Sequence, residues 1–445
     1  MHNTSSFRIS RRSFLLQTAA LGVAFPWVSR LGAASANDLL NHASFGASGM
    51  AAADLEALMG TKQVRLVAVA DVDLPRAQAL KQKFPDIRIY QDWRVLLDKE
   101  QKNIESVNVS TPDHMHAPIA LAAMQLGKHV YGQKPLTQNV FEARQVTLQA
   151  RKSAVVTQMG IQIHSNVEYR TAVKLIQDLA IGKVKEVHSW SGKKWGDLDP
   201  MPDRSDPVPE GFNWDFWLGV ATQRPYINGY YHPGNWRKRL DFGTGTFGDM
   251  GCHIYDPVFK ALALTAPLSL RSEGLAPNQH NWAINALIHY VFPGNQYTAD
   301  KTVKVTWYDG DMRPSPEVQS LVKIEQFPDQ GSLFIGTEGV LLLPHIGMPR
   351  LFPEEKFDDY KVPTLSNLNH WQQYVEACRG QGKTSAHFDY AGPLTETVLL
   401  GGVATRFPKQ TLEWDAAQLR FTNVSEANRH LRRDYRSGWE PKWPA

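Results

Sequence analysis

Between residues 39 and 159, short apolar runs alternate with amphipathic stretches, and this alternation restricts the possible fold more than any other feature of the sequence. Residues 64–70 (VRLVAVA) form a run that is apolar apart from Arg65 and is of the kind that is buried on both faces of a parallel sheet. Regular alternation of strands and helices predicts an α/β fold with a doubly wound parallel sheet. The expected strands are 39–45, 64–70, 104–110, 129–132 and 154–159, and the expected helices are 49–59, 74–84, 92–100, 117–126 and 140–152.

The pattern changes after residue 160. One helix, 167–181, precedes longer strands with alternating polarity, which predict an α+β domain with a large, mostly antiparallel open sheet. A stretch rich in Pro, Gly and Trp, 197–235, is too long for an ordinary connection and is therefore expected to be functional. The expected strands are 184–193, 268–273, 286–292, 303–307, 321–326 and 332–343.

The sequence begins with a pattern typical of a twin-arginine export signal. Arg11 and Arg12 precede an apolar run that ends near residue 28, and an Ala-Ser-Ala cleavage site follows at residues 34–36. A membrane anchor is the alternative, but the run is shorter than the roughly 20 residues that a spanning helix needs. We therefore expect a signal peptide at 1–36, export through the twin-arginine translocon, and a periplasmic or otherwise exported protein. The expected domains are 37–160 for nucleotide binding and 161–445 for substrate binding and oligomerisation.

Removal of residues 1–36 would also remove the excess positive charge. The chain has 48 basic and 44 acidic residues, and the first 36 residues contain four arginines and no acid. The remaining 44 basic and 44 acidic residues give no electrostatic reason to expect nucleic acid as a partner. Cys252 and Cys378 allow at most one disulfide and belong to no spaced metal motif.

The turn after the first expected strand carries the small residues of a dinucleotide-binding loop. Gly46, Ser48, Gly49 and Met50 lie where the backbone would approach a pyrophosphate at a helix N-terminus, although Ser48 stands where a full glycine motif has glycine. A tight turn between a strand and a helix is the structural alternative. Asp71 ends the second expected strand, where a carboxylate accepts hydrogen bonds from the adenosine ribose and disfavours a 2′-phosphate. The cofactor expected on this basis is NAD rather than NADP, unless Asp71 only caps the following helix.

Several motifs along the chain together resemble the Gfo/Idh/MocA oxidoreductases, a family named for glucose–fructose oxidoreductase and inositol dehydrogenase. The resemblance implies a Rossmann domain, a C-terminal open-sheet domain, and a homodimer or homotetramer. The motifs lie at residues 68–73, 110–116, 132–136, 157–162, 243–253, 336–339 and 390–406.

The resemblance also implies residue roles. Ser110 and Thr111 would line the nicotinamide side of the cofactor, and His116 and Gln162 would belong to the same binding site. Lys134 matches the lysine of the family's Glu-Lys-Pro motif, which positions a substrate hydroxyl near the nicotinamide. Gln133 replaces the acid of that motif and removes a negative charge beside the nicotinamide.

The expected reacting centre combines Lys134, Asp249 and His253. Asp249 and His253 are four residues apart and share one face of a helix. Removal of a hydride from a secondary alcohol needs a base for the hydroxyl proton, and histidine suits this role near neutral pH. Asp249 would orient the imidazole or bind the sugar, and the Lys134 cation would stabilise alkoxide character. A hydrogen-bonded pair on a helix and a solvated turn lysine are the structural alternatives.

Other candidate residues have weaker patterns. Tyr231, His232, Trp236 and Arg237 could form a wall that contacts a sugar, or they could pack a long loop. His114 and His116 flank Met115 without an evident third ligand, so no metal site is expected.

The sequence therefore predicts an exported NAD(P)-dependent oxidoreductase that acts on a carbohydrate or polyol hydroxyl and holds its nucleotide tightly. Two alternatives remain open at this point. One is an NAD-dependent glycoside hydrolase that works through a transient 3-keto sugar and uses Tyr231, His232 or His164 as an extra base. The other is a non-catalytic binding protein on the same fold.

Overall fold

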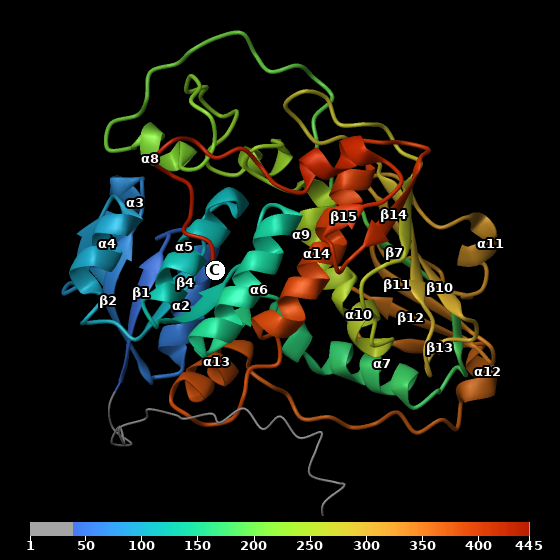
Figure 1. Ribbon diagram of the computed structural model, residues 1–445. Coiled ribbons are helices and arrows are strands. Elements are labelled where there is room, and N and C mark those ends of the chain that lie inside the picture. The colour runs from blue at the N-terminus through green and yellow to red at the C-terminus, as the bar shows by residue number, and fades with distance from the viewer. Residues whose placement is uncertain (1–38, 445) are drawn as a thin grey trace, which may run out of the picture. The chain divides into compact units, whose positions relative to one another are not determined.

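The computed structural model describes residues 39–444. The expected signal peptide therefore lies outside the described residues. Leu39–Ala445 forms one compact unit, in which two sheets can be followed in Figure 1.

The first sheet has six parallel strands in the order β3-β2-β1-β4-β5-β6, which confirms the predicted Rossmann-type sheet. Its predicted strands are present, and the sequence analysis missed only the short edge strand β3. The strands are β1 (Leu40–Phe45), β2 (Val64–Ala70), β3 (Arg88–Tyr90), β4 (Ser106–Val109), β5 (His129–Gly132) and β6 (Thr157–Met159). The covering helices are α2 (Met50–Gly60), α3 (Leu74–Lys83), α4 (Trp93–Glu100), α5 (His116–Gln125) and α6 (Val140–Ser153).

The second sheet has nine strands in the order β13-β12-β11-β7-β10-β9-β8-β14-β15. Only the β7–β10 pair is parallel, so the predicted, mostly antiparallel sheet is confirmed. The strands are β7 (Val184–Ser191), β8 (Ser269–Ser272), β9 (Leu287–Pro293), β10 (Thr302–Asp309), β11 (Gln330–Gly336), β12 (Val340–Pro344), β13 (Arg350–Phe352), β14 (Thr411–Asp415) and β15 (Arg420–Phe421).

Two strand predictions in this half were wrong. Residues 321–326 form no strand, because Val322 and Ile324 pack on the sheet face formed by Trp190 and Tyr308 instead of joining the ladder. The predicted strand 332–343 is a hairpin, in which β11 and β12 pair antiparallel on either side of residues 337–339.

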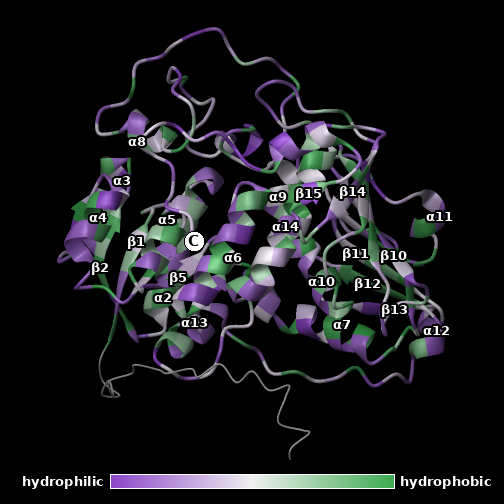
Figure 2. Ribbon diagram, viewed as in Figure 1, coloured by the Kyte–Doolittle hydropathy of each residue, from purple (hydrophilic) through white to green (hydrophobic). Residues whose placement is uncertain are grey.

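Helices cover the other face of the second sheet and enclose the largest core. They are α7 (Val167–Gln177), α9 (Gly245–Ile254), α10 (Asp256–Ala261) and α14 (Phe388–Ala404). Figure 2 shows β12 as largely hydrophobic and α4 as a mixture of hydrophobic and hydrophilic residues. This difference follows from burial, because β12 is buried along most of its length and α4 has one solvent-exposed side.

Two late helices and the C-terminal residues return to the first sheet. Helix α13 (His370–Cys378) packs against α2, and α14 packs against α6 (Figure 1). The C-terminal residues also pack there: Gln125 Nε2 donates to the Lys442 carbonyl at 2.6 Å, and the guanidinium of Arg94 lies 4.0 Å from the ring centre of Trp439. Within residues 39–444, no helix is both long and apolar enough to cross a membrane.

Candidate active site

The glycine turn between β1 and α2 has the geometry of a phosphate-binding loop. Gly46 has a φ of +105°, and a Cβ atom there would lie 2.7 Å from the Ser110 carbonyl oxygen. Gly49 has a φ of +59° and would place a Cβ in open space with no heavy atom within 4 Å. Helix α2 begins directly after Gly49 and has no acid in its first turn. Its N-terminus is therefore free to face an anion such as a pyrophosphate.

Asp71 and Arg76 lie beside this turn, at the end of β2. The Asp71 carboxylate accepts hydrogen bonds from the amides of Ala47 at 2.8 Å and Asp73 at 2.9 Å. Burial raises the pKa of Asp71 to about 6. Arg76 donates to Ser48 Oγ at 2.8 Å and to Asp73 Oδ2 at 2.8 Å, so a cation lies next to the expected ribose position.

Residues from both halves of the chain line one cleft above the turn. Gly46, Ser48, Gly49, Met50 and Asp71 form one side, and the opposite side comes from residues 216–237. The cleft has a volume of about 1110 Å³, including space open to solvent. It also contains Ser110, Thr111, Pro112, Arg76, Trp217, His232, Trp236 and Arg237.

The segment that covers the cleft is hydrogen-bonded to the first domain. The Leu74 amide donates to the Gly211 carbonyl at 3.0 Å, and the Asn213 amide donates to the Val72 carbonyl at 2.9 Å. His114 adds a contact of 3.0 Å between its Nε2 and the Trp217 carbonyl oxygen. The long Pro-, Gly- and Trp-rich stretch is thus ordered by contacts with the carboxyl edge of the first sheet.

The four residues expected to form a sugar-contacting wall lie in different places. Tyr231 is 1% exposed and packs among aromatic rings away from the cleft lining. His232 Nε2 lies 3.3 Å from Asp73 Oδ2, at the end of the cleft near Asp71. Trp236 and Arg237 lie in the cleft lining, and the Arg237 guanidinium is 4.3 Å from the Trp236 ring centre.

Lys134 and Asp249 form an ion pair at the Arg237 end of the cleft. Lys134 Nζ donates to Asp249 Oδ1 at 2.7 Å and to the Asp249 carbonyl at 2.8 Å, and Arg237 Nε donates to Asp249 Oδ1 at 3.4 Å. Burial raises the pKa of Asp249, but the charges of Lys134 and Arg237 outweigh this effect and lower it to about 2. Asp249 is therefore ionised near neutral pH and holds the two cations beside the cleft.

His253 is one turn further along α9 and is buried. Burial, together with the charges of Lys134 and His345, lowers its pKa well below the usual value. Within the described chain, its buried Nδ1 atom has no hydrogen-bond partner. A neutral imidazole near a lysine can accept a proton from a substrate hydroxyl.

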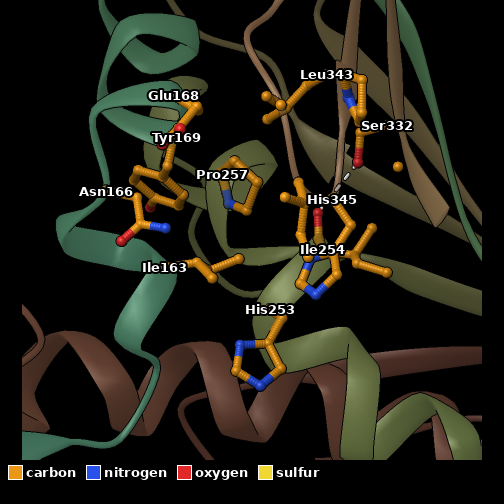
Figure 3. Close-up of a pocket in the computed structure, with 14 residues that line it drawn as sticks. Ile163, Asn166, Glu168, Tyr169, His253, Ile254, Pro257, Ser332, Leu343 and His345 are labelled. Atoms are coloured by element: carbon orange, nitrogen blue, oxygen red, sulfur yellow. Dashed lines mark hydrogen bonds between the residues drawn. The ribbon is translucent and has the colours of Figure 1, made fainter.

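His253 also lies in the wall of a smaller cavity. Figure 3 shows His253 at one end of this cavity, with Asn166 and Tyr169 along one side and Ser332 and His345 along the other. The His253 and His345 ring centres are 5.7 Å apart. The residues expected to form the reacting centre therefore lie between the nucleotide cleft, which Arg237 lines, and a smaller cavity whose lining includes polar side chains.

Gln133, the departure from the family motif, is hydrogen-bonded to a buried carboxylate that the sequence analysis missed. Gln133 Nε2 lies 3.0 Å from Asp54 Oδ1 and 2.8 Å from Oδ2. Asp54 also accepts from Ser110 Oγ at 2.8 Å and from Trp371 Nε1 at 3.1 Å. Burial raises the pKa of Asp54 to about 6. A buried carboxylate of α2 thus lies beside the position where the family motif has an acid, and it is hydrogen-bonded to Ser110 in the cleft lining.

The other residues assigned to cofactor binding differ in exposure to the cleft. Ser110 and Thr111 line it, and Gln162 Nε2 lies 4.0 Å from Met50 Sδ. His116 is buried behind the cleft, with Nδ1 2.7 Å from the Pro135 carbonyl oxygen and Nε2 2.7 Å from the Thr111 carbonyl oxygen. His116 therefore contributes to the cleft indirectly, because it fixes the backbone at Thr111 and Pro135.

Asp113 is a second residue without a role in the sequence analysis. It follows β4, is 4% exposed, and accepts a hydrogen bond from Thr244 Oγ1 at 2.8 Å. Burial raises its pKa to about 7, although the charges of Arg237 and Lys134 act in the opposite direction. The presence of an acid within the 110–116 motif was the only sequence feature that pointed to Asp113. Its position near Asp249 becomes visible only in the folded structure.

The remaining candidates occupy structural positions. His164 Nδ1 lies 2.8 Å from Asp256 Oδ2 in a fully buried pair, so none of Tyr231, His232 and His164 lines the cavity beside His253. Both cysteines are free and buried, and burial raises the pKa of Cys252 to about 12. Within residues 39–444, no group of three or more His, Cys, Asp or Glu side chains is placed to hold a metal ion.

A Rossmann-type sheet with a glycine turn, an acid at the end of β2 and a Lys–Asp pair beside a neutral histidine is the arrangement of a nicotinamide-dependent oxidoreductase. Family comparison agrees. A model described as the oxidoreductase family's NAD-binding Rossmann fold matches residues 40–161, and one described as its C-terminal alpha/beta domain matches residues 179–302. Together they cover more than half of the chain, which therefore belongs to the Gfo/Idh/MocA oxidoreductase family.

Among curated proteins, the chain is similar to sugar and inositol dehydrogenases. It is 24% identical over 192 residues to the levoglucosan dehydrogenase of Pseudarthrobacter phenanthrenivorans, which covers 43% of this chain and 40% of that protein. It is 22% identical over 188 residues to the NADP-dependent scyllo-inositol 2-dehydrogenase of Bacillus subtilis, 42% of each chain. The chain thus spans about two fifths of the length of these relatives.

Solved structures share the fold over most of the chain. The WlbA dehydrogenase of Bordetella pertussis, in complex with NADH and UDP-GlcNAcA, has a TM-score of 0.59 at 13% identity and covers 85% of this chain and 99% of its own. The aldose-aldose oxidoreductase of Caulobacter crescentus, complexed with glycerol, has a TM-score of 0.57 at 14% identity, with 84% and 100% covered. Because the identities are this low, the likeness concerns the fold.

Proposed function

We propose that this protein is an exported, NAD-dependent oxidoreductase that transfers hydride between a secondary hydroxyl of a carbohydrate or polyol and a tightly held nicotinamide cofactor. The observation that carries the proposal is the Lys134–Asp249 pair beside a neutral His253, between the nucleotide cleft and the smaller cavity. The dehydrogenases among the curated relatives support the substrate class. The acid at Asp71 supports NAD over NADP.

A bound nicotinamide would supply the hydride acceptor for this chemistry. The residues of the chain hold the substrate and move the proton. His253 accepts the hydroxyl proton as the carbon–hydrogen bond breaks, and Lys134 stabilises the negative charge that develops on the same oxygen. Asp249 holds the Lys134 ammonium in place. A second carbohydrate with a carbonyl group would reoxidise the cofactor by the reverse steps.

Tight retention of the cofactor is supported by the covering segment. Residues 211–237 lie across the cleft opposite the glycine turn and are hydrogen-bonded to residues 72–74. A nucleotide in the cleft is enclosed from both sides, so its release requires these contacts to open. The twin-arginine motif supports the same proposal, because a protein exported after folding can carry a cofactor that is absent outside the cytoplasm.

The test begins with the protein purified without added cofactor. It is denatured, and any released nucleotide is identified by mass and absorbance before and after exposure to polyols, aldoses and glycosides. Stoichiometric NAD that becomes reduced, with a keto sugar as product, is the expected result. Consumption of a glycoside without net oxidation would instead favour the redox-neutral hydrolase, and a protein that binds neither nucleotide would refute the proposal.

Lys134→Met tests the site itself, with the exposed Lys185→Met as its matched control. We expect Lys134→Met to lower kcat by about 10²–10³-fold, since it removes a cation from the developing alkoxide. Nucleotide content is expected to remain unchanged in both variants. Equal activity of Lys134→Met and Lys185→Met would remove Lys134 from the mechanism.

A further inference from the structure

A second cleft lies on the side of α9 opposite the reacting centre and is lined by four arginines. It lies among α6, α9, α14 and the C-terminal residues 429–434, which are close together in Figure 1. Its volume is about 1300 Å³, including space open to solvent. Gly248 of α9 and Thr244, which precedes that helix, line this cleft, whereas Asp249 and His253 belong to the expected reacting centre. The arginines are Arg406, Arg429, Arg432 and Arg433.

The positive charge of this arginine cleft is only partly neutralised. Asp241 and Asp434 are the two acids of the lining, and Asp241 forms an ion pair with Arg224 outside it. Of the arginines in the lining, Arg432 pairs with Glu440 at 2.8 Å. The lining therefore carries two more cations than anions, because burial and the nearby charges of Arg406 and Arg429 lower the pKa of His430 to about 4 and leave it neutral.

Arg406 is the central feature of the cleft. It lies just after α14, and its guanidinium is 5.3 Å from the ring centre of Trp282. Its amide donates to the Val403 carbonyl at 3.0 Å, but within the described residues its guanidinium makes no ion pair or hydrogen bond. Burial lowers the pKa of Arg406 to about 10, so the side chain stays charged near neutral pH. The nearby charge of Asp241 compensates this half-buried guanidinium only in part and without an ion pair, so an anionic ligand would stabilise it.

Neighbouring donors point to the same chemistry. Arg433 donates through Nη1 to the Asp241 carbonyl at 3.0 Å, while its buried Nε has no partner in the described chain. Arg429 is exposed, contacts the His430 ring through Nε at 3.2 Å, and forms no ion pair with a described carboxylate. Guanidinium groups present parallel donors that match the oxygens of phosphate, sulfate or carboxylate.

We propose that the arginine cleft binds a small oxyanion-bearing molecule, such as a phosphorylated, sulfated or uronic-acid sugar, with Arg406 and Arg429 as its anion ligands. The cleft is separate from the nucleotide cleft, since the two share no lining residue. This proposal does not depend on the assignment of the reaction.

Isothermal titration calorimetry tests the proposal on the full protein with excess NAD, so that added anions do not occupy the pyrophosphate position. The probes are inorganic phosphate, sulfate and glucuronate, with glucose as the uncharged control, all at constant ionic strength. We expect one site per chain for at least one of the anions and none for glucose. Phosphate and sulfate binding alone would indicate a phosphorylated or sulfated ligand, whereas glucuronate binding alone would indicate an acidic sugar.

Arg406→Gln and Arg429→Gln are each expected to weaken anion binding by about tenfold or more, the effect of one charge-assisted hydrogen bond. Arg65→Gln, an exposed arginine of the first domain, is the matched control and should leave binding unchanged. Arg429 is exposed, so its replacement should not disturb folding even if Arg406→Gln does. No binding of any anion, or equal binding by Arg429→Gln and the wild type, would overturn the proposal.

Discussion

The Asp54–Gln133 contact predicts that moving the carboxylate from position 54 to position 133 costs less stability than either single substitution would suggest. Gln133→Glu would place two carboxylates about 3 Å apart in a buried site, where two unit charges repel by about 5 kcal/mol at an effective dielectric constant near 20. Part of this repulsion is relieved when the pair takes up a proton. We expect Gln133→Glu to lower the free energy of unfolding by about 3 kcal/mol at pH 8 and by less at pH 5.

Asp54→Asn is expected to cost about 2 kcal/mol, because one amide oxygen cannot replace two carboxylate oxygens that accept from Gln133, Ser110 and Trp371. The double variant restores an amide opposite a carboxylate. The double variant should therefore lose less unfolding free energy than the sum of the two single losses, by at least about 2 kcal/mol.

Urea unfolding at pH 5 and pH 8 measures these differences, and NAD affinity provides a second readout near Ser110. Gln78→Glu on the exposed side of α3 controls for a general effect of one added charge. If the losses of unfolding free energy in the two single variants add up to the loss in the double variant within about 0.5 kcal/mol, the reasoning is refuted, because the two side chains would then not interact.

Three further predictions concern single positions. Because Asp113 has a pKa raised to about 7, its contribution to stability is lost as the pH rises from about 4 to 7. Asp113→Asn should therefore flatten the pH dependence of the unfolding free energy by about 4 kcal/mol across that range, as measured by urea titration. Gly46→Ala should lower stability by about 1–3 kcal/mol and weaken nucleotide binding, whereas Gly127→Ala, also at positive φ but with open space around it, should cost about 1 kcal/mol in thermal unfolding. Because the pKa of His253 is strongly lowered, the acid limb of kcat/KM should lie below pH 6, and an activity loss centred near pH 6.5 would contradict its assignment as the neutral base.

Periodicity was enough to predict the type of both sheets, but not the short strands β3, β13, β14 and β15. Strands with apolar residues on both faces, such as Val64–Ala70, can be recognised without knowing their neighbours. The failures occurred where the same apolar residues are buried in another way. Val322 and Ile324 alternate like strand residues but cover a sheet face, and the pattern alone contains no information about hydrogen-bonded partners.

The sequence predicted the proximity of candidate site residues that lie close together in the chain. Asp249 and His253 share α9 as their spacing indicates, and the family resemblance implied that Lys134 lies near them, as its contact with Asp249 shows. Asp54 is different, because Gln133 is 79 residues away and Trp371 is 317 residues away. Only the packing of α13 on α2 brings these partners together, and no local pattern encodes that contact.

Because α13, α14 and the C-terminal residues return to the first sheet, the two domains cannot be treated as independent folding units. Trp371 of α13 supplies a hydrogen bond to Asp54, and residues near Trp439 cover the outside of α4. A fragment ending near residue 160 would keep every strand of the nucleotide-binding sheet yet expose the α2 and α6 surfaces that α13 and α14 bury. The domain boundary in the sequence is therefore not a suitable end point for an isolated domain. Exchange of the C-terminal domain between relatives would also replace part of the buried surroundings of the cofactor site.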